Sequence, residues 1–255
     1  MSALGRPRVH LRRTDSTNER ARALALAGAA HGTLVTASEQ TAGRGRQGRS
    51  WLAPPGSSVL MSLLVRQPPQ LLPLIAAVAV CDVAGEEAQI KWPNDVVIAQ
   101  DTGAGTLFGK LAGTLIEGRP QQGWAVVGIG LNVAVRLEEL PPELRPGSGA
   151  GVGPNLAQPA ATLGRTPADV EPALSQLLAA LERRLGQDPE TTLEAWRARD
   201  ALRGRQITWG THGVEGSLAR GRADGIDGLG RLVVARDDGG LLTLGAGEVH
   251  LAPLE

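Results

Sequence analysis

The pattern of apolar and polar positions in the first half of the chain predicts a sheet assembled from short strands. Apolar and β-branched residues concentrate in five segments, separated by glycine, proline and polar residues. The expected strands are Thr33–Ser38, Ser57–Val65, Gln89–Ile98, Lys110–Glu117 and Trp124–Val133. Pro93 interrupts the third of them and requires a bend or a tight turn, because proline cannot occupy a central ladder. A bend would aim Asn94 and Asp95 out of the pleat. The polar stretch Gln100–Gly109 predicts a hairpin loop.

Helical periodicity and helix-end signals predict four helices. They are expected from Ser16 to Gly28, from Leu71 to Cys81, from Thr166 to Gly186, and from Asp188 through Trp196. Ser16 and Glu19 form a capping-box pattern at the start of the first. The second is an apolar run far shorter than the ~20 residues that span a bilayer, so it predicts a buried helix.

Near Arg203 the pattern changes to short β segments separated by glycine turns. These segments are Gln206–Trp209, Val214–Arg220, Arg231–Ala235, Leu241–Leu244 and Glu248–Leu251. They predict a small β-barrel of about 50 residues, joined to the rest by a linker at Arg197–Gly204. We therefore expect two domains, residues 1–202 and residues 203–255.

Composition limits the kind of partner and compartment. The chain has 255 residues and a formal net charge of zero, so bulk attraction to nucleic acid or to a membrane is not indicated. The single cysteine, Cys81, excludes an intrachain disulfide and a multi-cysteine metal site. The basic segment Met1–Arg13 has no apolar core and is not a secretory signal. We expect a cytoplasmic protein with no membrane contact.

One stretch departs from this balanced background. Residues 43–49, within Gln40–Trp51, hold three arginines and three glycines and no acidic residue. Glycine lets a ligand approach the backbone closely, and arginine offers forked donors that suit phosphate or carboxylate. The glycines also match G-x-G-x-x-G, but Pro54 and Pro55 forbid the helix that a dinucleotide fingerprint needs. We expect the loop to bind an anion, and a solvated basic turn is the alternative.

A groove is expected beside this loop. Gly128, Gly130 and Asn132 share one face of the last predicted strand of the first half, and that face carries almost no side chain. Gly113 inside the preceding strand is typical of close ligand approach. Lys110 is expected to open that strand next to the groove, although an exposed strand-end lysine is the alternative.

Taken in order, these motifs resemble those of biotin–protein ligases. The matching segments are Ser16-Thr17-Asn18, Gln40 through Trp51, Lys91-Trp-Pro-Asn-Asp95, Lys110-Leu-Ala-Gly113 and Gly128-x-Gly-x-Asn132. The segments Gly225-Ile-Asp227 and Ala246-Gly-Glu-Val249 are similar to that family's small SH3-like domain. The resemblance covers nearly the whole chain. It implies an α+β fold, with a mixed-sheet catalytic domain like that of class II aminoacyl-tRNA synthetases and biotin ligases, plus a C-terminal SH3-like β-barrel.

The resemblance also implies a reaction. Biotin and ATP, the latter with Mg²⁺, would give biotinoyl-AMP and pyrophosphate. The biotinoyl group would then pass to a lysine of the biotin carboxyl carrier protein or domain of acetyl-CoA carboxylase or a related carboxylase. The first step brings two anions together, so fixed positive charge should dominate catalysis. We expect residues 43–49 to be mobile without ligand and to order over the adenylate, which excludes water.

On this resemblance each matching residue takes an expected role. The catalytic residues are Lys110, Arg44 and Arg46. The biotin-binding residues are Ser16, Thr17, Asn18, Gln40, Arg44, Gly45, Arg46, Lys110 and Gly113, since the ureido ring of biotin needs paired donors and acceptors. The ATP- or adenylate-binding residues are Arg46, Arg49, Trp51, Asn94, Lys110 and Asn132, with Trp51 stacked on adenine. Asp95 is assigned a water-mediated contact with Mg²⁺.

Two other functions are weighed against this one. Lipoate ligases and octanoyltransferases are the nearest alternative, but they lack the arginine–glycine loop followed by tryptophan. A nucleic-acid-binding module is a rival of another class, and the zero net charge without a wider basic stripe argues against it. Because the motif at Ser16 leaves no room upstream for a helix-turn-helix domain, we expect no specific DNA binding. The sequence leaves a homodimer open. Three features depart from the family pattern: Gln47 stands where some members have a basic residue, Thr114 stands where an aliphatic residue is usual, and the loop Gln100–Gly109 is longer than the commonest form.

Overall fold

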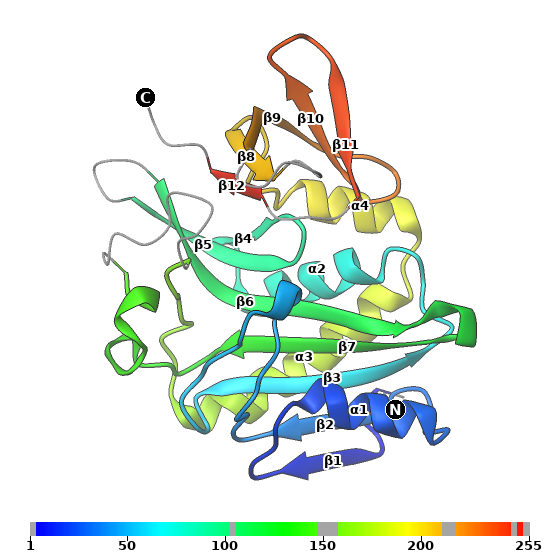
Figure 1. The fold of residues 1–255 in the computed structure, drawn as a ribbon. Coiled ribbons are helices and arrows are strands. Elements are labelled where there is room, and N and C mark those ends of the chain that lie inside the picture. The colour runs from blue at the N-terminus through cyan, green and yellow to red at the C-terminus, as the bar shows by residue number, and fades with distance from the viewer. Residues whose placement is uncertain (1–3, 102–105, 147–157, 211–217, 246–248, 252–255) are drawn as a thin grey trace.

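A seven-stranded mixed sheet forms the centre of the molecule (Figure 1). The computed structural model describes residues 4–101, 106–146, 158–210, 218–245 and 249–251. The sheet has the order β1-β2-β3-β7-β6-β5-β4, with β1 parallel to β2 and the other neighbours antiparallel. Its strands are β1 (Arg8–Leu11), β2 (Leu34–Ala37), β3 (Ser58–Arg66), β4 (Ala88–Lys91), β5 (Asp95–Asp101), β6 (Thr106–Arg119) and β7 (Trp124–Asn132). The mixed-sheet α+β fold is confirmed.

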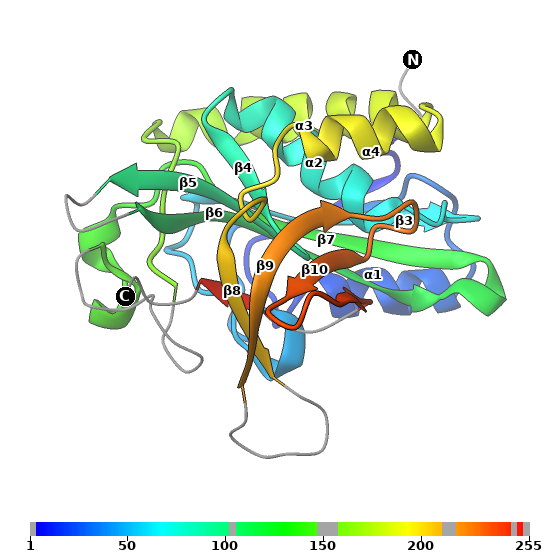
Figure 2. The same ribbon diagram turned by 90° about the horizontal axis from the view of Figure 1, so that it is seen from above.

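Helices cover both faces of this sheet (Figure 2). On one face α1 (Thr17–Leu26) packs against β2, β3 and β7. On the other lie α2 (Leu72–Ala84), α3 (Val170–Leu185) and α4 (Pro189–Arg197). There α2 packs against β4, β5 and β6, α3 packs against α2 and β3, and α4 packs against α2. Ten of the thirteen residues of α2 are buried, so the apolar run is the buried helix that the sequence predicts. In the described ranges no helix is long and apolar enough to cross a membrane.

The helix starts show which local signals hold. Thr166 caps the short 3₁₀ turn Pro167–Asp169 that leads into α3, in a capping box with Asp169. The capping box predicted for Ser16 and Glu19 is wrong. Ser16 is the N-cap of α1 but makes no side-chain cap bond. Asp15 accepts from the Ser16 amide, which Glu19 would bind in a capping box, and Glu19 pairs instead with Arg22 and Arg44.

Two turns place the polar motifs. β4 and β5 form a hairpin with Lys91 opposite Asp95, so Trp92, Pro93 and Asn94 make a tight turn, with a cis Trp92–Pro93 peptide bond. The β5–β6 hairpin is longer than predicted, since its pairing continues to Asp101 and Thr106. Lys110 therefore lies inside β6 rather than at its start, and a register shift opposite Val96 and Val97 falls beside it.

The C-terminal residues form a second, antiparallel sheet in the order β11-β10-β9-β8-β12. Its strands are β8 (Gln206–Gly210), β9 (Leu218–Ile226), β10 (Leu232–Arg236), β11 (Leu241–Leu244) and β12 (Val249–Leu251). The strand predicted at Val214–Arg220 corresponds to β9, which extends beyond Arg220 to Ile226. Residues 211–217 lie outside the described residues. Residues 246–248 do so as well, and they include Glu248 of the last predicted strand.

The two sheets share one apolar core. Ile207 and Leu232 of the second sheet belong to the same cluster of buried side chains as Ile90 of β4. The predicted linker is fixed to the first sheet, because the Ile90 amide donates to the Arg199 carbonyl (2.6 Å) and the Ala201 amide donates back to the Ile90 carbonyl (3.0 Å). The division into residues 1–202 and 203–255 stays a prediction.

Candidate active site

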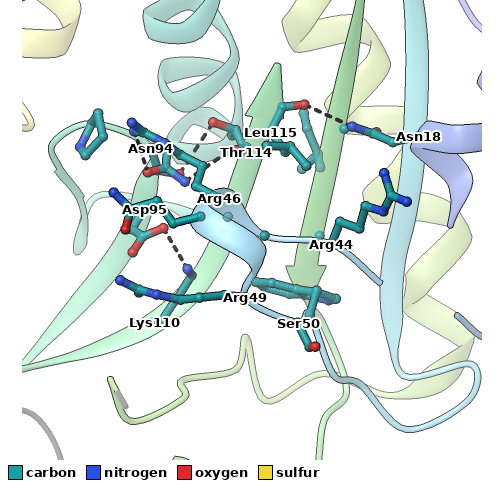
Figure 3. Close-up of a pocket in the computed structure, with 18 of the residues that line it drawn as sticks. Asn18, Arg44, Arg46, Arg49, Ser50, Asn94, Asp95, Lys110, Thr114 and Leu115 are labelled. Carbon is teal, nitrogen blue, oxygen red and sulfur yellow. Dashed lines mark hydrogen bonds and ion pairs between the residues drawn. The ribbon is translucent and has the colours of Figure 1, made fainter. Parts of the chain in front are cut away.

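One pocket gathers the predicted motifs (Figure 3). It lies where the start of α1 and the glycine-bearing parts of β6 and β7 meet the basic loop and the β4–β5 turn, and Val249 of β12 completes its wall. The predicted site residues that line it are Ser16, Thr17, Asn18, Gln40, Arg44, Gly45, Arg46, Arg49, Trp51, Asn94, Asp95, Lys110 and Gly113. These come from segments far apart in the chain, so the fold itself assembles the pocket.

The floor of the pocket depends on glycine. A Cβ atom at Gly130 would lie 2.7 Å from Trp51 Cζ2, and one at Gly128 would lie 2.8 Å from Asn18 Cγ. One at Gly113 would lie 3.2 Å from both Lys110 Cε and the Trp51 ring. The groove predicted from these glycines is therefore present, and the side chains of Asn18 and Trp51 fill part of it.

A buried polar network forms one end of the pocket. Thr17 donates to Gln40 Oε1 from both its amide (2.7 Å) and its hydroxyl (3.0 Å). Ser62 of β3 donates to Asn18 Oδ1 (2.6 Å), and Asn18 Nδ2 donates to Glu117 Oε2 (2.7 Å). Thr17, Asn18 and Ser62 are almost fully buried, so these bonds fix the side chains before any ligand arrives.

Ser62 and Glu117 were not among the residues predicted from the sequence. The signal for Ser62 was a lone hydroxyl within an otherwise apolar strand. That signal was incomplete, because only the register of β3 against β7, in which Ser62 faces Gly128, brings it to Asn18.

Positive charge forms the other end of the pocket. Lys110 Nζ lies 2.7 Å from Asp95 Oδ1 and 5.8 Å from the centre of the Trp51 ring. Arg46 donates to Asn94 Oδ1 (3.3 Å), and burial lowers the pKa of its guanidinium. Figure 3 shows Arg46, Arg49 and Lys110 around Asn94 and Asp95. Arginine stays ionised even so, and this end therefore suits a polyanion.

Lys91 also lines this end, and the sequence reasoning gave it no role. Burial lowers the pKa of its ammonium; the nearby Asp95 opposes that effect, while the positive charges of Lys110 and Arg49 add to it. The signal that could have found it is its place opposite Asp95 in the predicted strand–turn–strand.

Two predicted residues lie apart from this charge cluster. Arg44 lines the pocket but forms an ion pair with Glu19 of α1, and Figure 3 shows it turned away from Asp95 and Lys110. Asn132 is buried and is not a lining residue. Its Nδ2 donates to the Ala161 carbonyl (2.9 Å), so in this arrangement its amide holds backbone rather than facing a ligand.

The lining residues do not form a resident metal site. Asp95 is the one carboxylate among them, and it is already paired with Lys110. Within the described ranges no three His, Cys, Asp or Glu side chains are grouped to hold an ion. Mg²⁺ in nucleotide sites is held by one or two carboxylates plus phosphate oxygens, so Asp95, paired with Lys110, supplies at most one protein ligand.

The chain is similar to proteins of one family. The model of the biotin/lipoate A/B protein ligase family matches residues 10–133. The chain is 35% identical to a biotin–[acetyl-CoA-carboxylase] ligase of Paracoccus denitrificans, over 94% of this chain and 98% of that protein. It is 39% identical to the bifunctional ligase/repressor BirA of Bacillus subtilis over 51% of this chain, and there it spans 42% of that protein. Among solved structures, a biotin protein ligase from Aquifex aeolicus in complex with biotin and ATP has a TM-score of 0.74 at 22% identity, covering 97% of this chain and all of that one. At that identity it supports the fold.

Proposed function

The chain belongs to the biotin/lipoate A/B protein ligase family, and on this premise we propose that it is an ATP-dependent biotin–protein ligase. It joins biotin to ATP as biotinoyl-AMP with release of pyrophosphate, and then transfers the biotinoyl group to a lysine of a biotin carboxyl carrier protein or domain. The observation that carries the proposal is the union of a preformed network of hydrogen-bonded polar side chains and a cationic cluster at opposite ends of one pocket.

The polar end suits the ureido ring of biotin. That ring carries both donors and acceptors, and a buried site must pair them or lose affinity. Ser16, Thr17, Asn18 and Gln40 bring hydroxyl and amide groups to this end. Because Thr17 and Asn18 are already held by Gln40 and Ser62, little side-chain freedom is lost when biotin binds.

The cationic end suits the reaction between the biotin carboxylate and the α-phosphate. Lys110 is the point charge proposed to lie between these anions, and it must exchange Asp95 for them. Arg46 and Arg49 are proposed to bind the phosphates and the adenylate, with Arg46 and Gly45 also against biotin. In such a site, fixed charges that stabilise the charge developing in the transition state usually contribute more to the rate than any other single effect.

Trp51, Asn94 and Asn132 keep their proposed places at the nucleotide. Trp51 lies on Gly113 and Gly130, and its Nε1 is buried with no hydrogen-bond partner among the described residues. An indole without a partner is free to donate to a ligand. Asn132 would act through backbone rather than by direct contact, given its bond to Ala161.

The basic loop is proposed as the cover of the adenylate. Residues 43–49 also line a second hollow, together with Leu115 and Glu117. Arg44 would leave Glu19 and turn toward biotin when the ligand binds. Limited proteolysis with and without biotin plus ATP measures this ordering, and equal cleavage within residues 43–49 in both states would contradict it.

The remaining assignments follow from the family. We propose acetyl-CoA carboxylase as the client enzyme, since the Paracoccus relative is named for it. ATP is proposed to enter as its Mg²⁺ complex, to which Asp95 offers at most one ligand. The second sheet is proposed to be an SH3-like domain, and the protein is proposed to act in the cytoplasm without specific DNA binding. Homodimerisation is left to measurement.

The test is transfer to a carrier. The protein is incubated with biotin, MgATP and an apo carrier domain, and attached biotin is detected with labelled streptavidin; parallel reactions contain lipoate or octanoate and are read by mass spectrometry of the carrier. We expect biotin alone to be attached. Arg46→Ala should lower the rate strongly, whereas Arg236→Ala, which removes an exposed ion pair on the second sheet, should not. Attachment of lipoate or octanoate in place of biotin would favour the alternative enzyme class.

A further inference from the structure

Lysine is almost absent from this chain, and where it occurs is informative. The sequence contains 24 arginines and two lysines, Lys91 and Lys110. Both lysines line the same pocket, one from β4 and the other from β6. Apart from histidine, all the remaining basic residues are arginine, so the compact ammonium group occurs only at these two positions. Lys110 has a role in the proposed reaction, and Lys91 does not yet have one.

The backbone directs Lys91 into the pocket. It is the last residue of β4, where buried Ala88 and Ile90 alternate with half-buried Gln89 and Lys91. Ile90 belongs to the main core, so Lys91 lies on the opposite, pocket-facing side of the strand. The hairpin sets Lys91 directly across from Asp95.

The charges around Lys91 leave its ammonium poorly compensated. Asp95 is the one carboxylate lining the pocket, and its Oδ1 pairs with Lys110 at 2.7 Å. Within the part of the chain that the structure describes, no hydrogen bond or salt bridge to the Lys91 ammonium is formed. The other charged groups that line this end are Arg46, Arg49 and Lys110, all positive. Burial, opposed by Asp95, lowers the pKa of Lys91 in agreement with this arrangement.

We propose that Lys91 is a second phosphate-binding ammonium, which holds the terminal phosphates of ATP and then the departing pyrophosphate. This inference rests on the proposed function and assigns a residue within it. Asp95 pairs with Lys110 and lies opposite Lys91 in the β4–β5 hairpin, and a polyphosphate chain that enters this end supplies the negative charge that one carboxylate does not.

The role requires no proton transfer from Lys91. A carboxylate oxygen of biotin forms a bond to the α-phosphorus, the bond from that phosphorus to the bridging oxygen breaks, and pyrophosphate leaves with the electron pair. Lys91 remains an ammonium ion throughout and stabilises the charge that accumulates on the leaving group. A second positive charge there favours both ATP binding and bond cleavage.

A lysine suits this position better than an arginine. An ammonium is a compact point charge with three rotatable donors, whereas a guanidinium is a wide planar fork. The space beside the β4–β5 turn already contains the guanidinium of Arg46 on Asn94 and the Lys110–Asp95 pair. Lys91→Arg is therefore expected to keep the charge without restoring the binding.

The experiment compares Lys91→Met, Lys91→Arg and the matched control Gln89→Met on the same side of β4. Biotin-dependent ATP–pyrophosphate exchange gives KM for ATP and KM for pyrophosphate, and calorimetry gives the Kd of biotin alone. We expect Lys91→Met to raise KM for both ATP and pyrophosphate by about 10- to 100-fold, as befits one hydrogen bond to a charged group. The Kd of biotin should change less than about twofold, and Gln89→Met should match the unaltered protein in every value.

Each of the remaining outcomes contradicts a specific part of the proposal for Lys91. If Lys91→Met leaves both KM values unchanged, or if it weakens biotin as much as ATP, Lys91 does not bind phosphate. If Lys91→Arg equals the unaltered protein, the requirement for lysine is wrong. A thermal melt of each variant separates misfolding from loss of binding. When biotinoyl-AMP is supplied together with the carrier, the first step is bypassed, and Lys91→Met should then transfer biotin at the normal rate. If the unaltered protein itself shows no exchange, the proposed function fails instead.

Discussion

Gly128→Ala is a one-carbon change that should disable the polar end of the pocket. A Cβ atom at this position would lie 2.8 Å from Asn18 Cγ and 2.9 Å from Asn18 Nδ2, closer than side chains tolerate. The amide of Asn18 must therefore move. It would give up its hydrogen bond from Ser62 (2.6 Å) and its bond to Glu117 (2.7 Å).

The magnitude follows from these contacts. Overpacking a well-filled interior costs about 1–3 kcal/mol, and a buried hydrogen bond to a carboxylate contributes about 1.5–3 kcal/mol. Because moving Asn18 relieves part of the clash, we expect a loss of about 2–4 kcal/mol in the free energy of unfolding. For a chain of this size that corresponds to a fall in Tm of about 4–16 °C. Since the displaced amide also belongs to the proposed biotin site, the Kd of biotin should rise about tenfold or more.

The assay pairs thermal melting with calorimetric titration of biotin. Gly210→Ala is the matched control, because that strand glycine has open space where the new methyl would go. In the double variant Asn18→Ala/Gly128→Ala the clashing side chain is gone, so the second substitution should cost almost nothing beyond the first. Equal Tm and equal biotin affinity for Gly128→Ala and Gly210→Ala would refute the reasoning.

Three further predictions test other parts of the account. Lys110→Met should slow biotinoyl-AMP formation by about 10²–10³-fold in a single-turnover assay, and a normal rate would exclude the proposed electrostatic role. Trp92→Phe removes the indole N–H that donates to the Gly230 carbonyl at 3.1 Å. The free energy of unfolding should fall by about 0.5–1.5 kcal/mol, and hydrogen–deuterium exchange of the amides of residues 227–231 should become faster. Unchanged exchange would contradict a link between the sheets through this bond. Burial alone would raise the pKa of Asp82, but its hydrogen bonds and charge pairing with Arg184 outweigh that effect and lower it. Because the pKa of Asp82 is lower in the folded state, its ionised form stabilises the protein above the unfolded value of about 3.9, and this stabilisation is lost as the pH falls through the folded pKa. Asp82→Asn should therefore reduce the fall in Tm that acid pH produces. An unchanged fall in Tm would argue against this.

The sequence predicted what local patterns determine. The strands of the first sheet other than β1, the buried helix α2 and the glycine groove at Gly128 and Gly130 follow from periodicity and from residues with special backbone properties. The strand β1 was not predicted. Thirteen of the fourteen predicted site residues line one pocket because the fold brings together the start of α1, the basic loop, the β4–β5 turn and the middle of β6. Their roles stay predictions.

The remainder depends on contacts between distant parts of the chain. Ser62 joins the site through strand register, which no pattern within β3 specifies. The capping box predicted at Ser16 fails because Asp15 accepts from the Ser16 amide and Glu19 pairs instead with Arg44, far along the chain. Arg44 forms an ion pair with Glu19 of α1. The sequence contains many acidic residues, so the charge of Arg44 alone does not show which one it pairs with. Such tertiary contacts override local propensity.

The most direct test of the account is mass spectrometry of the small molecules formed when the purified protein is mixed with MgATP and either biotin or lipoate, without any carrier. The account predicts a species with the mass of biotinoyl-AMP in the biotin reaction and no corresponding adenylate with lipoate. An adenylate formed with lipoate and not with biotin, or none in either reaction, would contradict it.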